Sequence, residues 1–195
     1  MKTLYWIIGI FALCISLLFM LGGSTAKLAV PLELDKVNPQ DHVKGNASST
    51  VVLVEYADFQ CPSCKAYYPI IRQVAETYGK DIAIVYRHFP LSSIHMNAEF
   101  AARASEAADK QGKFWEMHDM LFEKQDEWDN DGDYMKNFQS YAELIKLDVE
   151  QFKTDFNSKE VKDFVKAQKS YAGEIGLQGT PTFYLNGEKI ASPQS

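Results

Sequence analysis

The stretch VVLVEYADFQCPSC, residues 51–64, decides how this chain folds. Its first part, Val51–Tyr56, has the length and β-branched composition of a strand, and nearly all of it is apolar, which is typical of a strand buried on both faces. A helical pattern of apolar residues then runs from Cys61 to Gly79, and Ile82–Tyr86 has the composition of a second strand. This order of strand, helix and strand predicts a βαβ unit with a right-handed crossover.

The pattern changes after this unit. From about residue 97 to residue 172, apolar residues recur at every third or fourth position, which indicates amphipathic helices packed on a common core. Strand character returns at Thr182–Leu185, and Asn186–Gly187 is a hairpin signal that predicts a partner strand at residues 188–191. The sequence therefore predicts an α/β fold with a helical insertion at about residues 95–172. The chain stops soon afterwards, so we expect its C-terminal end to be incomplete.

Composition and charge limit the possible functions. The 195 residues are 46% hydrophobic and 24% charged, which is ordinary for a globular protein and argues against a disordered or low-complexity chain. The formal net charge is -6, and a phosphate backbone requires an excess of Lys and Arg. We therefore expect no nucleic-acid partner.

The N-terminus is expected to lie outside the folded domain. Leu4–Leu21 is a run of 18 residues without a charge, whereas a spanning helix needs roughly 17–25 residues and the core of a signal peptide about 7–15. We expect residues 1–26 to form a hydrophobic helix that acts as a signal anchor, with cleavage near Ala26 as a signal peptide left open. Residues 27–50 are expected to be a lead-in or linker, followed by the main domain at 51–195.

Cys61 and Cys64 stand at the boundary between the first strand and the first helix. Free N–H groups and the helix dipole favour negative charge there, so Cys61 is expected to have a lowered pKa and to be the exposed thiolate. Pro62 suits the first helical turn because its missing N–H is not needed. Cys64 lies one turn further on, close enough to form a disulfide with Cys61 and to resolve a mixed disulfide.

Two other interpretations of this pair are open. The cysteines are either incidental or half of a zinc site, but a closed zinc site needs four ligands and no second cysteine pair exists. The four histidines show no tight spacing; they are His42, His88, His95 and His118. We therefore predict no metal site and no cofactor.

A proline near the C-terminus is a second candidate. In Gly179–Phe183, Pro181 stands at the start of a strand, where a cis peptide bond would leave the backbone of the preceding residue free to pair with a peptide. The alternative is a trans proline that simply begins the strand.

Four segments, in order along the chain, resemble the DsbA-like thiol:disulfide oxidoreductases, and the similarity runs from about residue 48 to residue 190. They are Val51–Cys64, Tyr86–Leu91, Gln111–His118 and Gly179–Phe183. The resemblance implies a thioredoxin fold with an inserted α-helical subdomain, here preceded by the N-terminal hydrophobic helix. It also implies that the family's last strand is cut short here and that its final helix is missing.

The resemblance also implies a role for each site residue. Cys61 becomes the nucleophile, Cys64 the resolving thiol, and Pro181 the cis-proline, with Thr180 before it contacting the substrate. Glu55 matches the family's buried acidic residue, which helps to move a proton to or from Cys64. An ordinary edge or surface carboxylate is the alternative for Glu55.

Ser63 departs from the best-known strong oxidant of the family, which has His at this position. A protonated His stabilises the thiolate, whereas Ser offers only a hydroxyl, so we expect a milder oxidant. The expected function is a membrane-anchored, extracytoplasmic enzyme that forms disulfides in exported proteins with free thiols. A membrane-embedded oxidoreductase would reoxidise it.

Two further functions remain open. The same site suits a tethered thiol reductase or a disulfide isomerase. A different class of protein, a non-catalytic metal-binding or interaction module, is also compatible with this fold, since a fold does not fix a function.

Overall fold

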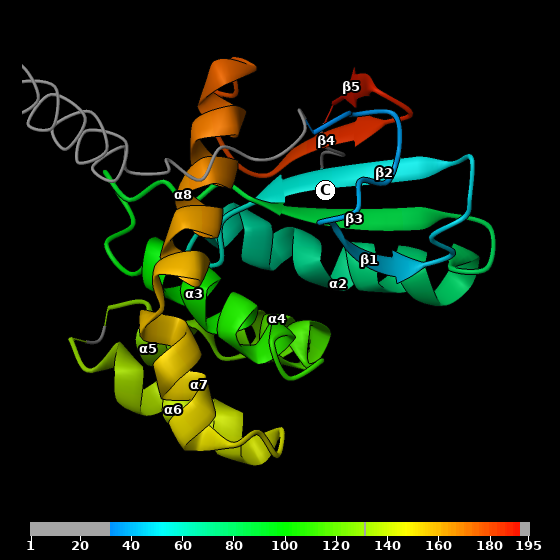
Figure 1. Cartoon of the computed structure of the whole chain (residues 1–195). Helices are drawn as coiled ribbons and strands as arrows, with labels where there is room; N and C mark the ends of the chain where they lie inside the picture. The colour runs from blue at the N-terminus through cyan, green and yellow to red at the C-terminus, as the bar shows by residue number, and fades with distance from the viewer. Residues whose placement is uncertain (1–31, 131, 192–195) are drawn as a thin grey trace, which may run out of the picture.

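The computed structural model of the chain describes residues 32–130 and 132–191. They form a five-stranded sheet in the order β1-β3-β2-β4-β5, with helices packed around it (Figure 1). β2 and β3 are parallel, and the other neighbouring strands are antiparallel. The strands are β1 (His42–Gly45), β2 (Val52–Ala57), β3 (Ala83–His88), β4 (Thr182–Leu185) and β5 (Glu188–Ile190).

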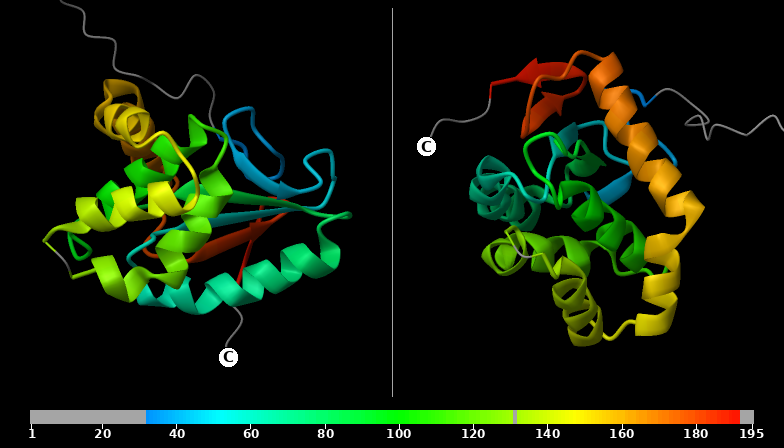
Figure 2. Two further views of the ribbon diagram at one scale, coloured as in Figure 1. Left: turned by 90° about the horizontal axis from the view of Figure 1, so that it is seen from below. Right: turned by 90° about the vertical axis from the view of Figure 1, so that its left-hand side faces the viewer.

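The predicted βαβ unit is confirmed at the centre of the sheet. Every residue of β2 and β3 is buried, and α2 (Pro62–Tyr78) connects them. The sheet lies between α2 on one face and α8 (Lys159–Glu174) on the other (Figure 2). Because side chains alternate along a strand, Leu53 of β2 packs towards α2, whereas Val52 and Val54 join the cluster that contains Ala172 of α8.

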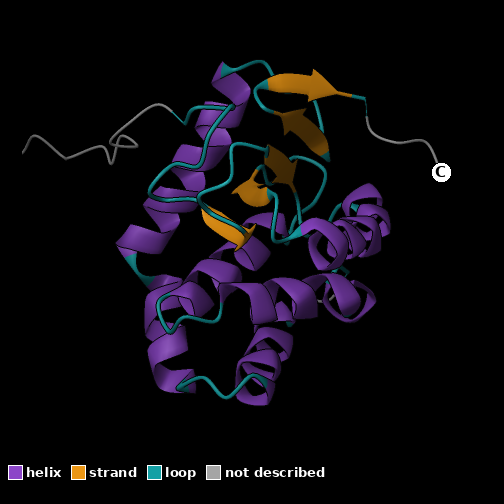
Figure 3. Cartoon of the chain, turned by 90° about the vertical axis from the view of Figure 1, so that its right-hand side faces the viewer, coloured by secondary structure: helices purple, strands orange, loops and turns teal. Residues whose placement is uncertain are grey.

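The predicted helical insertion is also confirmed. It consists of α3 (Ala98–Asp109), α4 (Phe114–Glu123), α5 (Gln125–Trp128), α6 (Tyr134–Leu144) and α7 (Val149–Asn157). These helices gather beside the strands in Figure 3, and α3 supplies a row of fully buried alanines to their core. Small side chains let neighbouring helices approach closely, so α3 is the central helix of the insertion.

The expected N-terminal helix cannot be placed in this fold, because residues 1–26 and the run Leu4–Leu21 lie outside the described residues. Across residues 32–130 and 132–191, no helix combines the length and the apolar composition needed to cross a membrane.

The structure contains a strand that the sequence analysis did not predict. β1 comes from the segment expected to be a lead-in, and it pairs with β3 so that His42 lies opposite Tyr86. Its sequence, HVKG, has one β-branched residue and no clear alternation. Gly45 ends the strand with a φ of 92°, and a Cβ atom there would lie 2.5 Å from the carbonyl oxygen of Ile82. Only glycine fits this close backbone crossing.

A buried ion pair attaches the segment before β1 to the sheet. Arg87 of β3 donates from Nε to Oδ1 of Asp41 at 2.9 Å and from Nη2 to Oδ2 at 2.8 Å. Both side chains are fully buried. The guanidinium also donates to the Tyr56 hydroxyl and to the carbonyl of Glu33. A bidentate pair with its remaining donors satisfied is the geometry in which buried charges are tolerated.

We expect Asp41→Asn to lower the free energy of unfolding by about 3–5 kcal/mol, because the change leaves the Arg87 charge buried without a partner. Urea denaturation measures this loss. Lys36→Met is the matched control, since it removes an exposed pair with Glu33 and should have no measurable effect. Equal behaviour of the two variants would contradict the structural role of the Arg87–Asp41 pair.

Candidate active site

Cys61 lies at the point where the loop after β2 meets α2. It is the N-cap residue of α2, with an extended backbone (φ -72°, ψ 122°), and Pro62 occupies the first helical turn. The backbone N–H of Cys61 donates to the carbonyl of Asp58 at 3.1 Å, which closes the turn that precedes the helix. The Cys61 sulfur is therefore held beside the free N–H groups of the first turn of α2.

The surroundings of Cys61 favour its thiolate. Its Sγ lies 3.4 Å from the carbonyl oxygen of Thr180. The residue is only 6% exposed, so the exposed position expected for this sulfur is wrong, because the sulfur packs against the backbone of Thr180. The pKa of Cys61 is lowered from 9.0 to about 5, and the largest cause is a hydrogen bond from the Cys64 thiol. The backbone N–H groups of Ser63 and Cys64 act in the same direction, whereas desolvation opposes them. Cys61 is therefore charged at neutral pH.

Cys64 has the opposite character. It is fully buried, and its Sγ accepts a hydrogen bond from the backbone N–H of Asp58 at 3.5 Å. Desolvation is the largest cause that raises the pKa of Cys64 well above its ordinary value, and the hydrogen bond to Cys61 adds to it. Cys64 is therefore a neutral thiol at neutral pH. This contrast is what the predicted roles of nucleophile and resolving thiol require.

The Thr180–Pro181 peptide bond is cis, as the resemblance implies. β4 begins at the next residue, and the hydroxyl of Thr182 donates to the carbonyl of Gly179 at 2.8 Å, which ties the loop back on itself. An open hollow lies along this loop and along residues 189–191 of the neighbouring hairpin. Thr180, whose carbonyl oxygen contacts the Cys61 sulfur, is one of the residues that line this hollow.

Glu55 is buried rather than exposed, so the alternative of a surface carboxylate is excluded. It is 4% exposed and lies on β2, between Tyr86 of β3 and Phe183 of β4. Desolvation raises the pKa of Glu55 to about 8. The charge of Glu55 also contributes to raising the pKa of Cys64, which shows that the two groups lie within electrostatic reach of each other. Its part in proton transfer stays a prediction.

Asp58 is a site residue that the sequence analysis did not select. It is 1% exposed, and its Oδ1 accepts from the backbone N–H of Gln60 at 2.8 Å. Its Oδ2 lies 2.7 Å from Nδ1 of His95 and accepts from the backbone N–H of Leu91 at 2.9 Å. Asp58 thus joins the turn that carries Cys61 to the loop after β3. The only signal in the sequence is its place in that turn.

Comparison with known proteins identifies relatives for most of the chain. Residues 37–195 match the family described as Thioredoxin. Curated relatives include "Na(+)/H(+) antiporter NhaA 1" of Mycolicibacterium vanbaalenii, 41% identical over 171 residues, and "Na(+)/H(+) antiporter NhaA 3" of Salinispora tropica, 37% identical over 176 residues. The matches cover 86% and 89% of this chain but 26% of each relative. The chain therefore spans about a quarter of the length of the curated relatives it matches.

Several solved structures share the fold. Pseudomonas aeruginosa DsbA2 is 27% identical with a TM-score of 0.63, and the match covers 80% of this chain and 87% of that protein. A thioredoxin-like oxidoreductase from Silicibacter pomeroyi is 27% identical with a TM-score of 0.66, over 78% and 84% of the two chains. BdbD from Bacillus subtilis, at 23% identity, has a TM-score of 0.72 over 83% and 90%, which shows a shared fold.

The ionisation of Cys61 provides a direct test of this geometry. We expect the rate of Cys61 alkylation by iodoacetamide to reach half its maximum near pH 5, because the thiolate is the reacting species. In Cys64→Ala the midpoint should move towards 9.0, since the largest stabilising hydrogen bond is lost. A midpoint that does not change in Cys64→Ala would contradict the role of that bond.

The buried Glu55 should make stability depend on pH. Its pKa is about 8 in the folded chain and near 4.5 in the unfolded chain, so the folded state binds the proton more tightly. The free energy of unfolding should therefore fall as pH rises from 4.5 to 8, by at most about 1.4 kcal/mol per unit.

Urea denaturation of wild type and Glu55→Gln at pH 5 and pH 8 measures this effect, because the difference between the two proteins cancels the titration of Cys61. Glu55→Gln should be stabilised relative to wild type at the higher pH. The exposed Glu143→Gln is the control and should parallel wild type. Parallel curves for Glu55→Gln as well would contradict the raised pKa.

Proposed function

We propose that Cys61 and Cys64 form disulfides in client proteins. The premise is that this chain belongs to the thioredoxin family, as one of its DsbA-like thiol:disulfide oxidoreductases. The observation that carries the proposal is the contrast between the two sulfurs. Cys61, with a pKa of about 5, contacts the backbone of Thr180 next to the cis-proline, whereas Cys64 is buried and neutral. A client thiolate therefore attacks the sulfur of Cys61. In the second step the same sulfur leaves as a stable thiolate.

The reaction starts from the disulfide between Cys61 and Cys64. A client thiolate attacks Sγ of Cys61, the disulfide breaks, and the electron pair and a proton go to Cys64, which becomes a thiol. A second client thiolate then attacks the client sulfur of the mixed disulfide, and Cys61 leaves as a thiolate. The client has gained a disulfide, and the enzyme has gained two electrons.

Glu55 is the group proposed to handle the proton at Cys64. With a pKa of about 8, it takes up or releases a proton near neutral pH without a large free-energy cost. The region around Cys64 is closed to bulk solvent, so an internal proton donor removes the need for water to enter. Glu55 and Tyr86 line a small, partly open cavity together with His118 of α4.

The redox direction follows from the stabilised thiolate. Each hydrogen bond that favours the Cys61 thiolate favours the reduced enzyme, and therefore makes the disulfide a better oxidant. Ser63 contributes its backbone N–H but no positive charge, which supports a milder oxidant than the family member with His at that position. A thiol reductase is the second candidate. Without a positive charge at residue 63 the Cys61 thiolate is less stabilised, and a less stable thiolate makes the reduced enzyme a better reductant.

The proposed location is outside the cytoplasm, where disulfides persist. The uncharged run Leu4–Leu21 supports attachment to the membrane, with cleavage near Ala26 as the alternative. Clients would be exported proteins with free thiols, and a membrane-embedded oxidoreductase would accept the electrons. Antiport is not carried over from the curated relatives, because they are about four times as long as the matched segment.

The reduction potential of the full chain in glutathione buffers tests the redox direction. We expect a value in the range of roughly -120 to -180 mV, and a value near about -270 mV would replace the oxidase with a reductase. Ser63→His should raise the potential by tens of millivolts, since an imidazolium stabilises the thiolate. Ser63→Ala is the matched control and should shift the potential much less.

A trapping experiment tests the roles of the two sulfurs. Cys64→Ala whose Cys61 first carries glutathione as a mixed disulfide should exchange the glutathione, which leaves as a thiolate, for a thiol of a reduced, unfolded client. The enzyme–client disulfide should then accumulate, because no Cys64 is present to resolve it. Cys61→Ala should form none and should have no oxidase activity while its circular dichroism spectrum stays unchanged. A mixed disulfide on Cys64 in Cys61→Ala would reverse the proposed roles.

A further inference from the structure

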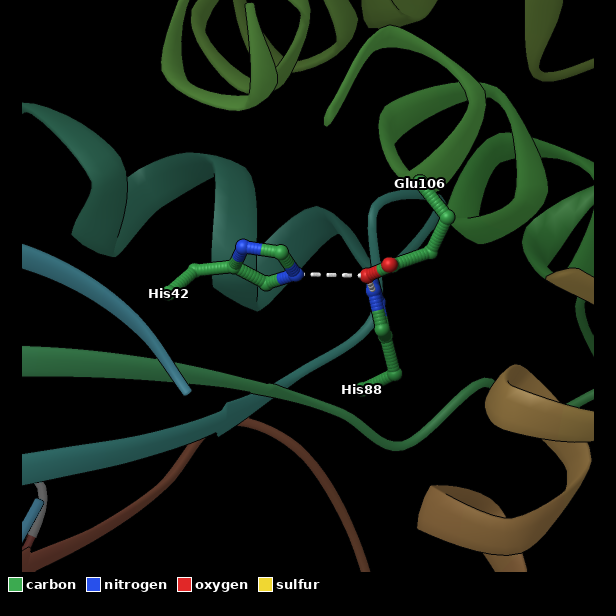
Figure 4. A group of neighbouring side chains, drawn as sticks. All are labelled: His42, His88 and Glu106. Carbon is green, nitrogen blue, oxygen red and sulfur yellow. Dashed lines mark hydrogen bonds and ion pairs between the residues drawn. The ribbon is translucent and has the colours of Figure 1, made fainter. Parts of the chain in front are cut away.

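Three side chains from three separate elements converge where the sheet meets the helical insertion (Figure 4). His42 comes from β1, His88 from the end of β3 and Glu106 from α3. Oε1 of Glu106 lies 2.7 Å from Nε2 of His42 and 2.7 Å from Nε2 of His88. The three ligand atoms all lie within 4.8 Å of one another. The disulfide chemistry proposed above assigns no role to this group.

We propose that His42, His88 and Glu106 bind one divalent metal ion of the kind that takes nitrogen ligands, such as Zn²⁺. Two imidazole nitrogens and one carboxylate oxygen aimed at a single point are a common protein ligand set for such an ion. Calcium and magnesium are disfavoured, because both prefer ligand sets made of oxygen atoms.

The geometry suits an ion of this size. Zinc bonds of about 2.0–2.2 Å in a tetrahedral arrangement separate neighbouring ligand atoms by about 3.3 Å. The two 2.7 Å contacts therefore need to open by only a few tenths of an ångström. Small rotations of the three side chains achieve this. A fourth ligand would come from solvent, since the side chains of His42 and Glu106 are still 10% and 8% exposed.

The surroundings of the imidazoles support binding. Oδ1 of Asp109 lies 3.5 Å from Nδ1 of His42, on the side of the ring away from Glu106. Carboxylates on the far nitrogen of a metal-binding histidine fix its orientation and its tautomer. Phe114 stacks on the His42 ring, with centroids 3.5 Å apart and planes 7° apart. Nδ1 of His88 is buried without a hydrogen-bond partner among the described residues, so the second imidazole lacks an orienting carboxylate of this kind.

An ion at this point would connect the edge strand, the central sheet and the insertion. Its ligands are far apart in the sequence, which is why a search for closely spaced ligands predicts no metal site. The competing explanation is a hydrogen-bonded cluster that holds the same three side chains without an ion. The experiment below separates the two.

Zinc binding by the full chain tests the proposal, with Cys14→Ser, Cys61→Ser and Cys64→Ser introduced together so that no thiolate competes for the ion. Equilibrium dialysis should find one tightly held Zn²⁺ per chain, and Zn²⁺ should raise the Tm. Co²⁺ should give visible absorption bands without a thiolate charge-transfer band. Glu106→Gln should abolish this binding, and His95→Gln, which lies outside the cluster, should retain it.

A second variant keeps the test decisive if Glu106→Gln does not fold. Asp109 is about half exposed and supports His42 without being a ligand, so Asp109→Asn should fold and weaken Zn²⁺ binding about 10–100-fold. The absence of stoichiometric binding in the cysteine-free chain would overturn the proposal in favour of the hydrogen-bonded cluster. If Asp109→Asn binds Zn²⁺ with unchanged affinity, and a folded Glu106→Gln does so too, the ion lies elsewhere. That result would also overturn the proposal.

Discussion

The N-terminus of α2 is the constraint on which the site depends. A helix begins with N–H groups that have no partner inside it, and here the N–H groups of Ser63 and Cys64 help to lower the pKa of the Cys61 sulfur. That placement requires the strand before it to end at one fixed residue, and Asp58 fixes the turn in between. This turn follows directly from β2, which is buried beside β3, so the packing of the sheet fixes the position and the reactivity of the Cys61 sulfur.

Burial and hydrogen bonding then give the two cysteine thiols different pKa values. Cys61 and Cys64 are the same residue type, three positions apart, and their pKa values move in opposite directions. The pKa of Cys61 is lowered first by the hydrogen bond from Cys64 and then by the N–H groups of the helix terminus, whereas that of Cys64 is raised by desolvation. The same loss of water raises the pKa of Glu55 to about 8. The interior beneath the helix therefore tunes three ionisations, and those of Cys64 and Glu55 are also linked by charge.

Much of the fold and part of the site could be predicted from local patterns. The apolar, β-branched composition and the helical repeat within residues 51–86 predicted β2, α2 and β3, and the resemblance implied the cis bond before Pro181. The burial of Glu55 stayed open, because a single acidic residue in an apolar strand has no local signature. β1, the Arg87–Asp41 pair and the cluster at His42 were missed, because each depends on partners far away in the sequence.

The order of the chain has a consequence for its synthesis. Cys61 and Thr180, which touch in the folded protein, are 119 positions apart, since the insertion and α8 lie between them. At elongation rates of about 5–20 residues per second, Cys61 is added to the chain roughly 6–24 s before Thr180 is added. During that time β2 lacks its partner β4 and the two thiols have no covering loop. A growing chain of this design is exposed to premature oxidation, and to pairing with another chain's cysteines, until its last strands arrive.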